Sequence, residues 1–238
     1  MTHSHIVRSF DEDLNELRGR IVNMAALVSQ QFSQAEQSLL EKDLKLAAFV
    51  RANDKLVDQM EQEIEKNAIE LIATRSPLAD DLREIISAIK ISNALERIGD
   101  YAKNLSKRVV VLNEIKNFQI NHSVISQMIG IINIMNKDVI DAYINKSSDK
   151  AISVWTRDIV VDNLYDSLFR ELLTYMMENP EFITPATHLL FVAKNIERAG
   201  DHLTNIAELI YYIVEGKPLE MIRPKGDNSS ETNVDYSG

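Results

Sequence analysis

Two stretches of this chain carry the same acidic signature at a fixed separation. L-E-R-I-G-D at residues 95–100 recurs as I-E-R-A-G-D at residues 196–201, an offset of 101 residues. Upstream, D-K-L-V-D at residues 54–58 recurs as D-I-V-V-D at residues 158–162, an offset of 104 residues. Two signatures that recur in the same order indicate a duplicated unit, so the chain is predicted to fold as two similar halves.

Apolar residues recur at three- and four-residue spacing through almost the whole chain, and Leu95, Ile98, Ala102 and Leu105 are one example. This spacing places them on one face of a helix and predicts the seam of a helical bundle. The 238 residues include only seven Gly and five Pro, so few residues interrupt the helices. We therefore predict an all-α fold of two similar antiparallel three-helix bundles, with six long helices at residues 10–41, 43–74, 80–112, 123–145, 149–177 and 184–215.

The same periodicity divides the chain into four parts. We expect an N-terminal tail at residues 1–9, a first three-helix repeat at 10–115, a second at 116–216 and a flexible C-terminal tail at 217–238. Turn chemistry marks the breaks, because Ser76, Asn179 and Thr184 are each a capping residue followed by a Pro suited to the first helical position.

Composition excludes several classes of protein. With 26 basic and 36 acidic residues the net charge is −10, which argues against nucleic acid or anionic lipid as the main partner. Apolar runs such as residues 46–50 and 189–193 have five residues, well below the ~18 that would span a bilayer, so no membrane insertion is expected. No Cys is present, which excludes disulfides and thiolate metal sites. No secretory signal is visible at the start of the sequence, and the cytoplasm is the expected location.

Each copy of the repeat contains two pairs of acids four residues apart. On a helix this spacing stacks the two carboxylates, which repel each other by a few tenths of a kcal/mol, so four such pairs indicate a use for the repulsion. A helical wheel of ~100° per residue turns all four pairs away from the apolar seam and predicts surface clusters. If the helices that carry them are adjacent, the oxygens would suit hard cations such as Mg²⁺, Mn²⁺, Ca²⁺ or Fe³⁺. The alternative, a merely solvated helix face, remains open at this stage.

The residues between the acids have structural interpretations. Gly99 and Gly200 cost ~1 kcal/mol each inside a helix, and we expect them to admit the close approach of a neighbouring helix. Arg97 is expected to pair with Asp100 three residues later, and the second copy repeats this spacing. No Gly-rich phosphate loop or nucleophile-and-base constellation can be drawn from the sequence, so no catalytic residue is predicted and the protein is not expected to be an enzyme.

The duplicated E-R-x-G-D and D-x-x-x-D signatures, together with six helical segments, resemble the PhoU family of bacterial and archaeal phosphate-uptake regulators. The resemblance extends from about residue 10 to residue 216. It implies surface metal ions (Fe, Zn, Mn or Mg) at the family's acidic motifs. Transferred position by position, the implied ligands are Asp54, Asp58, Glu96, Asp100, Asp158, Asp162, Glu197 and Asp201.

The resemblance also implies a role and partners. The protein is expected to be a cytoplasmic accessory of the phosphate-specific ABC transporter that damps phosphate-starvation genes when phosphate is plentiful. Its implied partners are the transporter's ATPase subunit (PstB-like), the phosphate-sensing histidine kinase (PhoR-like) and a second copy of the chain in a homodimer. A metal-binding or metal-buffering bundle without a signalling role is the alternative. A ferritin-like enzyme is disfavoured, because that site needs a Glu-x-x-His pattern that this sequence lacks.

Overall fold

The computed structural model describes residues 2–115 and 122–221, with side chains from residue 10 onward. Within these ranges every regular element is helical and no strand is present. The elements are α1 (Thr2–Leu40), α2 (Leu44–Arg75), α3 (Ala79–Glu114), α4 (Ser123–Asn145), α5 (Ser148–Glu178), the short 3-10 helix η1 (Pro180–Phe182) and α6 (Ile183–Glu215). The prediction of an all-α fold with six long helices is confirmed.

Helix ends agree with the prediction within two residues, with one exception. Helix α1 already begins at Thr2, so residues 2–9 are helical where a tail was predicted. Ser76 does not start α3: it follows α2 in the left-handed region, with φ of 48°, and its N–H closes the last turn on Ile72. Asn179 does cap the next element, since its side chain accepts a hydrogen bond from the N–H of Glu181. Residues 116–121, at the start of the predicted second repeat, and the part of the predicted C-terminal tail beyond residue 221 lie outside the described residues.

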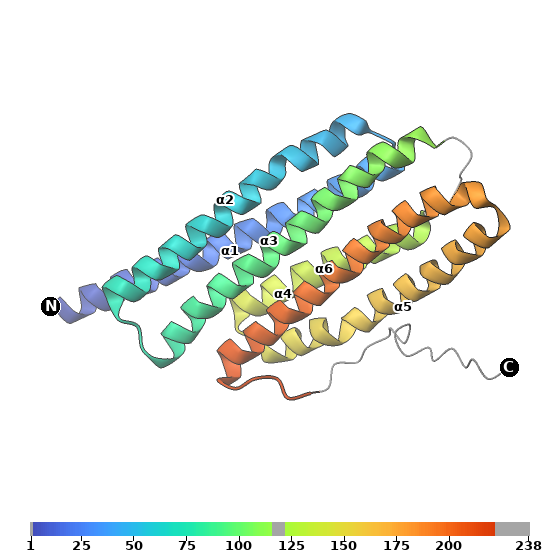
Figure 1. Cartoon of the computed structure of the whole chain (residues 1–238). Coiled ribbons are helices and arrows are strands. Elements are labelled where there is room, and N and C mark those ends of the chain that lie inside the picture. The colour runs from blue at the N-terminus through green and yellow to red at the C-terminus, as the bar shows by residue number, and fades with distance from the viewer. Residues whose placement is uncertain (1, 116–121, 222–238) are drawn as a thin grey trace.

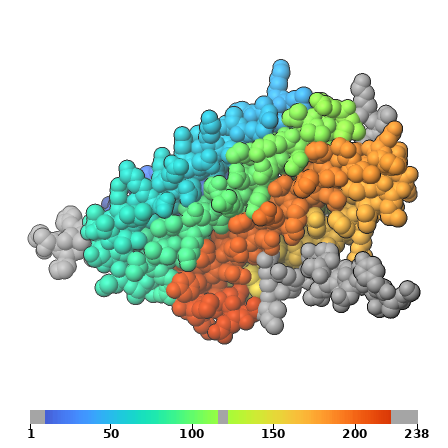
Figure 2. All heavy atoms as spheres, viewed as in Figure 1, coloured from blue at the N-terminus to red at the C-terminus, as the bar shows by residue number. Residues whose placement is uncertain are grey.

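The six helices form two three-helix bundles that lie side by side along their long axes (Figure 1). Helix α3 packs against α1 and α2 of its own bundle and also against α6, while α6 packs against α4, α5 and α3. Helices α2 and α5 lie at the outer edges, and α3 and α6 form a continuous seam on the face shown in Figure 2. The two helices that carry the E-R-x-G-D signature therefore lie side by side and join the two bundles.

The two bundles bury equivalent residues at the offsets found in the sequence. Along α2 and α5 the buried positions correspond at an offset of 104: Ala47 and Ala151, Val50 and Val154, Asp54 and Asp158, Val57 and Val161, Ile64 and Leu168, Ala68 and Leu172. Helices α1 and α4 follow the same offset, and α3 and α6 follow an offset of 101. The duplication is therefore a duplication of packing as well as of sequence.

Helices α3 and α6 cross in antiparallel directions. Near the start of α3, the guanidinium of Arg83 lies 5.5 Å from the ring centroid of Tyr212, near the end of α6. At the middle, Tyr101 Oη lies 3.2 Å from His202 Nε2, and these two residues occupy the same position of the two repeats. An axis relating the two repeats therefore passes close to this contact. None of the described helices is both long enough and apolar enough to cross a membrane.

Candidate functional site

The first acidic cluster lies where α2 packs against α3. It comprises Asp54 and Asp58 of α2 with Glu96 and Asp100 of α3. Asp54 is almost fully buried, with 2% of its surface exposed, and the other three acids are half-buried. Because α2 packs against α3, the two acidic pairs of the first repeat lie at the same helix–helix contact.

A lysine supplies the positive charge for the first cluster. Lys103 Nζ donates hydrogen bonds to Asp54 and to Asp100, with a distance of 3.1 Å to Asp100 Oδ1. The hydrogen bond with Asp54 raises the pKa of Lys103 and so keeps its ammonium charged. Burial raises the pKa of Asp54 in spite of this partner, and the nearby charges of Asp58 and Asp100 act in the same direction.

The remaining acids of this cluster repel one another. Burial raises the pKa of Glu96, and the charges of Asp100, Asp58 and Glu61 raise it further. Burial also raises the pKa of Glu61, helped by Glu65 and Asp58. Several carboxylates that disfavour each other's ionisation form a region of negative potential, which a cation would relieve.

The second acidic cluster lies at the equivalent contact between α5 and α6 and is more deeply buried. Asp158 is 1% exposed, Asp162 5% and Glu197 7%, whereas Asp201 is half-buried. Its lysine is Lys194, whose Nζ lies 2.8 Å from Glu197 Oε1, one turn before the signature rather than after it.

In the second cluster the surroundings of Glu197 disfavour its ionisation. Burial raises its pKa, and the charges of Asp201 and Asp162 act in the same direction against the hydrogen bond from Lys194. Its Oε2 atom is buried and accepts no hydrogen bond from any described residue. An oxygen in this state costs about 1–3 kcal/mol, so the second cluster also has capacity for a further cation or donor.

The two signature glycines allow the contacts that form these clusters. A Cβ at Gly200 would overlap Asp158 Oδ1, so only Gly lets this buried carboxylate approach α6. A Cβ at Gly99 would lie 3.2 Å from both Val57 Cγ1 and Gln31 Oε1, a tighter contact than Cβ atoms usually make. The predicted close approach of a neighbouring helix is confirmed in both repeats.

The predicted outward orientation of the acids is wrong. Asp54, Asp158, Asp162 and Glu197 are buried between helices instead of lying on a free surface. The helical wheel treated each helix as having one apolar buried face. Along α2 and α5, however, Asp54 and Asp158 lie within the buried stripe itself, and α6, which carries Glu197, packs against three other helices. The acids therefore occupy the helix contacts or their borders.

Chemically, the acids suit a hard metal ion, since all available donors are carboxylate oxygens. The described geometry does not yet form such a site, because no three Asp, Glu or His side chains within residues 10–115 and 122–221 converge as metal ligands would. In each cluster an ammonium group stands beside the carboxylates instead. The residues therefore fit a cation, and a metal ion would have to displace Lys103 or Lys194 and draw the acids together.

Both lysines were missed in the sequence. Lys103 follows Asp100 by three residues and Lys194 precedes Glu197 by three, which is a recognisable ion-pair spacing. The predicted pairing of Arg97 with Asp100 is wrong, because Arg97 Nε lies 3.5 Å from Glu96 Oε2. The lysines were overlooked because they lie outside the repeated signature, whereas the arginines lie inside it.

Comparison with known proteins gives a consistent result. The family model described as "PhoU domain" matches residues 21–109 and again residues 125–210. The "Phosphate-specific transport system accessory protein PhoU homolog" of Rhizobium meliloti (strain 1021) is 45% identical over 230 residues, covering 97% of each chain. The crystal structure of PhoU from Pseudomonas aeruginosa superposes with a TM-score of 0.84 at 36% identity, covering 87% of this chain and all (100%) of that one. The crystal structure of the phosphate transport system regulatory protein PhoU from Streptococcus pneumoniae has a TM-score of 0.82 at 29% identity, covering 89% of this chain and 100% of the other.

Proposed function

The chain belongs to the PhoU family, and from this membership we propose that it is an accessory protein of a phosphate transport system. The observation that carries the proposal is the extent of the similarity. Both repeats match the family model, and the Rhizobium meliloti accessory protein aligns with 97% of the chain. A likeness of this extent concerns the whole protein rather than a fold shared by unrelated functions.

We propose that the protein acts through contacts with other proteins in the cytoplasm. The partners are the ATPase subunit of a phosphate ABC transporter and a phosphate-sensing histidine kinase, and the outcome is lower expression of phosphate-starvation genes when phosphate is plentiful. The names of the relatives support this, since one is called an accessory and another a regulatory protein of phosphate transport. A second copy of the chain is proposed as a further partner, which light scattering of the purified protein would detect.

The acidic clusters are proposed to bind metal ions such as Fe, Zn, Mn or Mg. The candidate ligands are Asp54, Asp58, Glu96 and Asp100 in the first cluster, and Asp158, Asp162, Glu197 and Asp201 in the second. The raised pKa values of Glu96 and Glu197 and the unsatisfied oxygen of Glu197 support this proposal. A bound cation would neutralise the negative region and allow another protein surface to approach it.

Elemental analysis of double variants tests the metal proposal. Replacing Glu96 and Asp100 with Ala should lower the metal content by the share of the first cluster, and E197A/D201A should do the same for the second. The matched control is E63A/E70A, which removes two acids of α2 that are exposed and lie outside both clusters. If all three variants retain the metal content of the parent protein, the clusters are only charged borders of helix contacts.

Deletion of the gene tests the regulatory proposal. Expression of phosphate-starvation genes should rise in phosphate-replete cells and return to its low level when the gene is restored. The transporter ATPase and the kinase should co-purify with the tagged protein. Unchanged expression without co-purification would reject the regulatory role, and the metal-buffering alternative would then be favoured if the double variants lose metal.

A further inference from the structure

The turns that follow α1 and α4 are equivalent, and each contains a lysine. Lys42 and Lys146 have φ values of 55° and 48°, in the left-handed region. Each is followed directly by the N-cap residue of the next helix, Asp43 or Ser147. Because the two lysines occupy the same position of the two repeats, their surroundings can be compared residue by residue.

Around Lys146 the surroundings contain a buried carboxylate. Glu84 of α3 is 3% exposed and accepts hydrogen bonds from Arg18 Nη2 at 2.8 Å and from Lys146 Nζ at 3.0 Å. Burial opposes ionisation of Glu84, but the hydrogen bonds from the two cations outweigh it and lower the pKa of this carboxyl. At this end of the molecule both cations therefore share a buried carboxylate as their partner.

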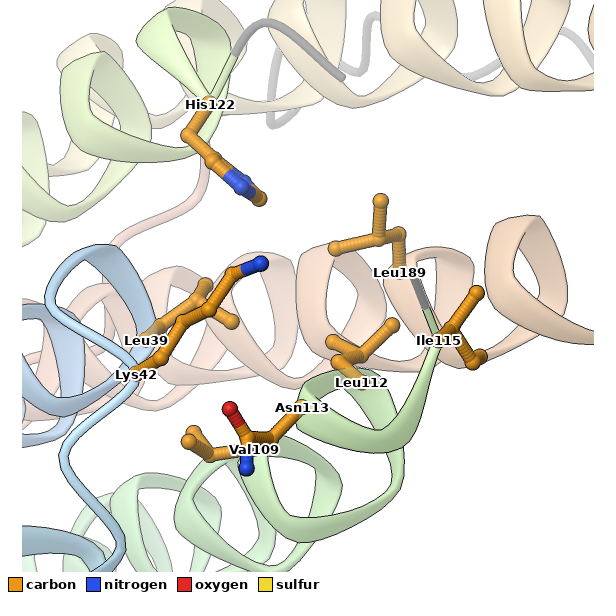
Figure 3. A pocket seen from close by; sticks show the side chains of 8 residues that line it. All are labelled: Leu39, Lys42, Val109, Leu112, Asn113, Ile115, His122 and Leu189. Carbon is orange, nitrogen blue, oxygen red and sulfur yellow. The ribbon is translucent and has the colours of Figure 1, made fainter. Parts of the chain in front are cut away.

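Around Lys42 the carboxylate is missing. At the repeat offsets, the position of Arg18 is taken by His122, that of Tyr143 by Leu39 and that of Glu84 by Pro185, where no charge is possible. In place of an ion pair there is a cavity of about 30 Å³. Figure 3 shows that the Lys42 and His122 side chains point towards each other across it, with leucine side chains on the other walls.

Within the described residues, no partner is found for the Lys42 ammonium or for one ring nitrogen of His122. His122 Nδ1 is buried and has no hydrogen-bond partner among the described residues. Among those same residues, no acid forms an ion pair with Lys42. Burial and the charge of Lys42 lower the pKa of His122, as expected for an imidazole beside an unmatched cation. Asn113 adds an amide that can donate a further hydrogen bond.

We propose that this cavity binds a small oxyanion in the place that the Glu84 carboxylate occupies at the opposite end. Lys42 supplies the charge, and His122 and Asn113 supply hydrogen-bond donors. The volume exceeds the ~10–15 Å³ that one water needs, which suits an anion of a few atoms and excludes a nucleotide. Lys42 is an exposed residue, so water partly screens its attraction to the anion. The proposal is independent of the regulatory role.

Nuclear magnetic resonance of the His122 ring in the full-length protein tests the proposal. The probes are sodium formate as a carboxylate and inorganic phosphate as a phosphate, each titrated at constant ionic strength. Saturable binding should raise the pKa of His122, since a neighbouring anion favours the imidazolium. The probe with the lower dissociation constant identifies which oxyanion the site prefers. If neither probe shifts the His122 resonance saturably, the cavity contains only water and the proposal is rejected.

A pair of equivalent variants provides the control. K42N removes the charge and keeps a residue that tolerates the left-handed conformation, and it should weaken binding by about tenfold or more, as expected for a charge-assisted hydrogen bond. K146N makes the same change in the other repeat and should leave binding unchanged. Equal binding by K42N and the parent protein would overturn the proposal.

A second variant places the missing carboxylate in the chain. P185E introduces Glu at the position equivalent to Glu84, so it should raise the pKa of His122 without added anion and abolish binding of both probes. A folded P185E protein that binds a probe as tightly as the parent would contradict the proposal. If P185E does not fold, K42N decides the outcome alone.

Discussion

The two acidic clusters occupy the same position in the two repeats but obtain their positive charge from different places. In the first repeat the cation is Lys103, on the C-terminal side of the signature, and in the second it is Lys194, on the N-terminal side. Neither lysine has a counterpart, since Thr204 and Asn93 occupy the equivalent positions. The carboxylates and glycines are therefore what the repeats share, whereas charge compensation differs. The recurrence of the acids without a fixed lysine supports the proposed cation sites.

The largest difference in stability between the repeats is expected at two equivalent positions, Glu84 and Pro185. E84Q should lower the free energy of unfolding by about 3 kcal/mol, because Arg18 and Lys146 lose a buried anion. P185A, at the equivalent position, should lower it by no more than about 1 kcal/mol, since only apolar contacts are lost. Urea unfolding at pH 7 measures both values. A similar loss in both variants would mean that the ion cluster does not stabilise the fold.

The stabilisation that Glu84 contributes should decrease at low pH. The pKa of Glu84 is lowered in the folded protein from its ordinary value of 4.5, so the unfolded chain binds its proton more readily. The stabilisation is complete above the unfolded-state pKa and is lost as the pH falls through the folded-state pKa. The difference in free energy of unfolding between the parent protein and E84Q should therefore be constant from pH 7 to about 5 and become smaller below about 4. A gap that is unchanged at low pH would contradict this assignment.

Substitution of the two signature glycines should give a difference in stability of intermediate size between the repeats. G200A should destabilise the protein by about 1–2 kcal/mol, because the added methyl group displaces the buried Asp158 carboxylate and this outweighs the better helix propensity of Ala. G99A should change stability by less than about 0.5 kcal/mol, since a small shift of Val57 and Gln31 offsets the gain in propensity. Thermal or urea unfolding of the pair tests the order. The reverse order would show that the first cluster is the more tightly packed.

The lysines should give the smallest difference in stability between the two repeats. K103M should destabilise by about 1 kcal/mol, because the buried Asp54 loses its hydrogen-bond donor and must bind a proton. K194M should cost about 0.5 kcal/mol or less, since Lys194 is 43% exposed and the pair is partly screened by water. In both variants a divalent cation should raise the melting temperature more than in the parent protein. A melting temperature that does not respond to the cation would argue that lysine is the permanent partner of these acids.

The repeat, the helices and the seam could be predicted because they depend on local periodicity. The identities of Gly99 and Gly200 also pointed to close helix contacts, which the positions of Val57 and Asp158 confirm. The burial of Asp158 and Glu197 could not be predicted, since it depends on the contacts that α5 and α6 make with neighbouring helices, and a helical wheel contains no information on neighbours. The left-handed conformation of Ser76 was also missed. The Ser-Pro pair was interpreted as the start of a helix, whereas Ser76 ends the preceding helix α2.

The cavity beside Lys42 was also not predictable from a single copy of the repeat. Its polar residues lie in α1, α3 and α4, or in the turns next to them, and only the fold brings them together. What the sequence does contain is the difference between Glu84 and Pro185, which becomes informative once the two repeats are aligned. Internal duplication thus provides a reference for each site within the same molecule.

The contact between Tyr101 and His202 shows what joining the two repeats in one chain has made possible. In a dimer of identical three-helix chains, the residue on the axis would meet its own copy, and a tyrosine there could face only a tyrosine. In a single chain, a substitution changes one side of the axis alone. A phenol can then lie 3.2 Å from an imidazole, a hydrogen-bonded pair that an exactly symmetric assembly cannot form. The centre of the molecule is therefore a place where the two halves became free to evolve separately.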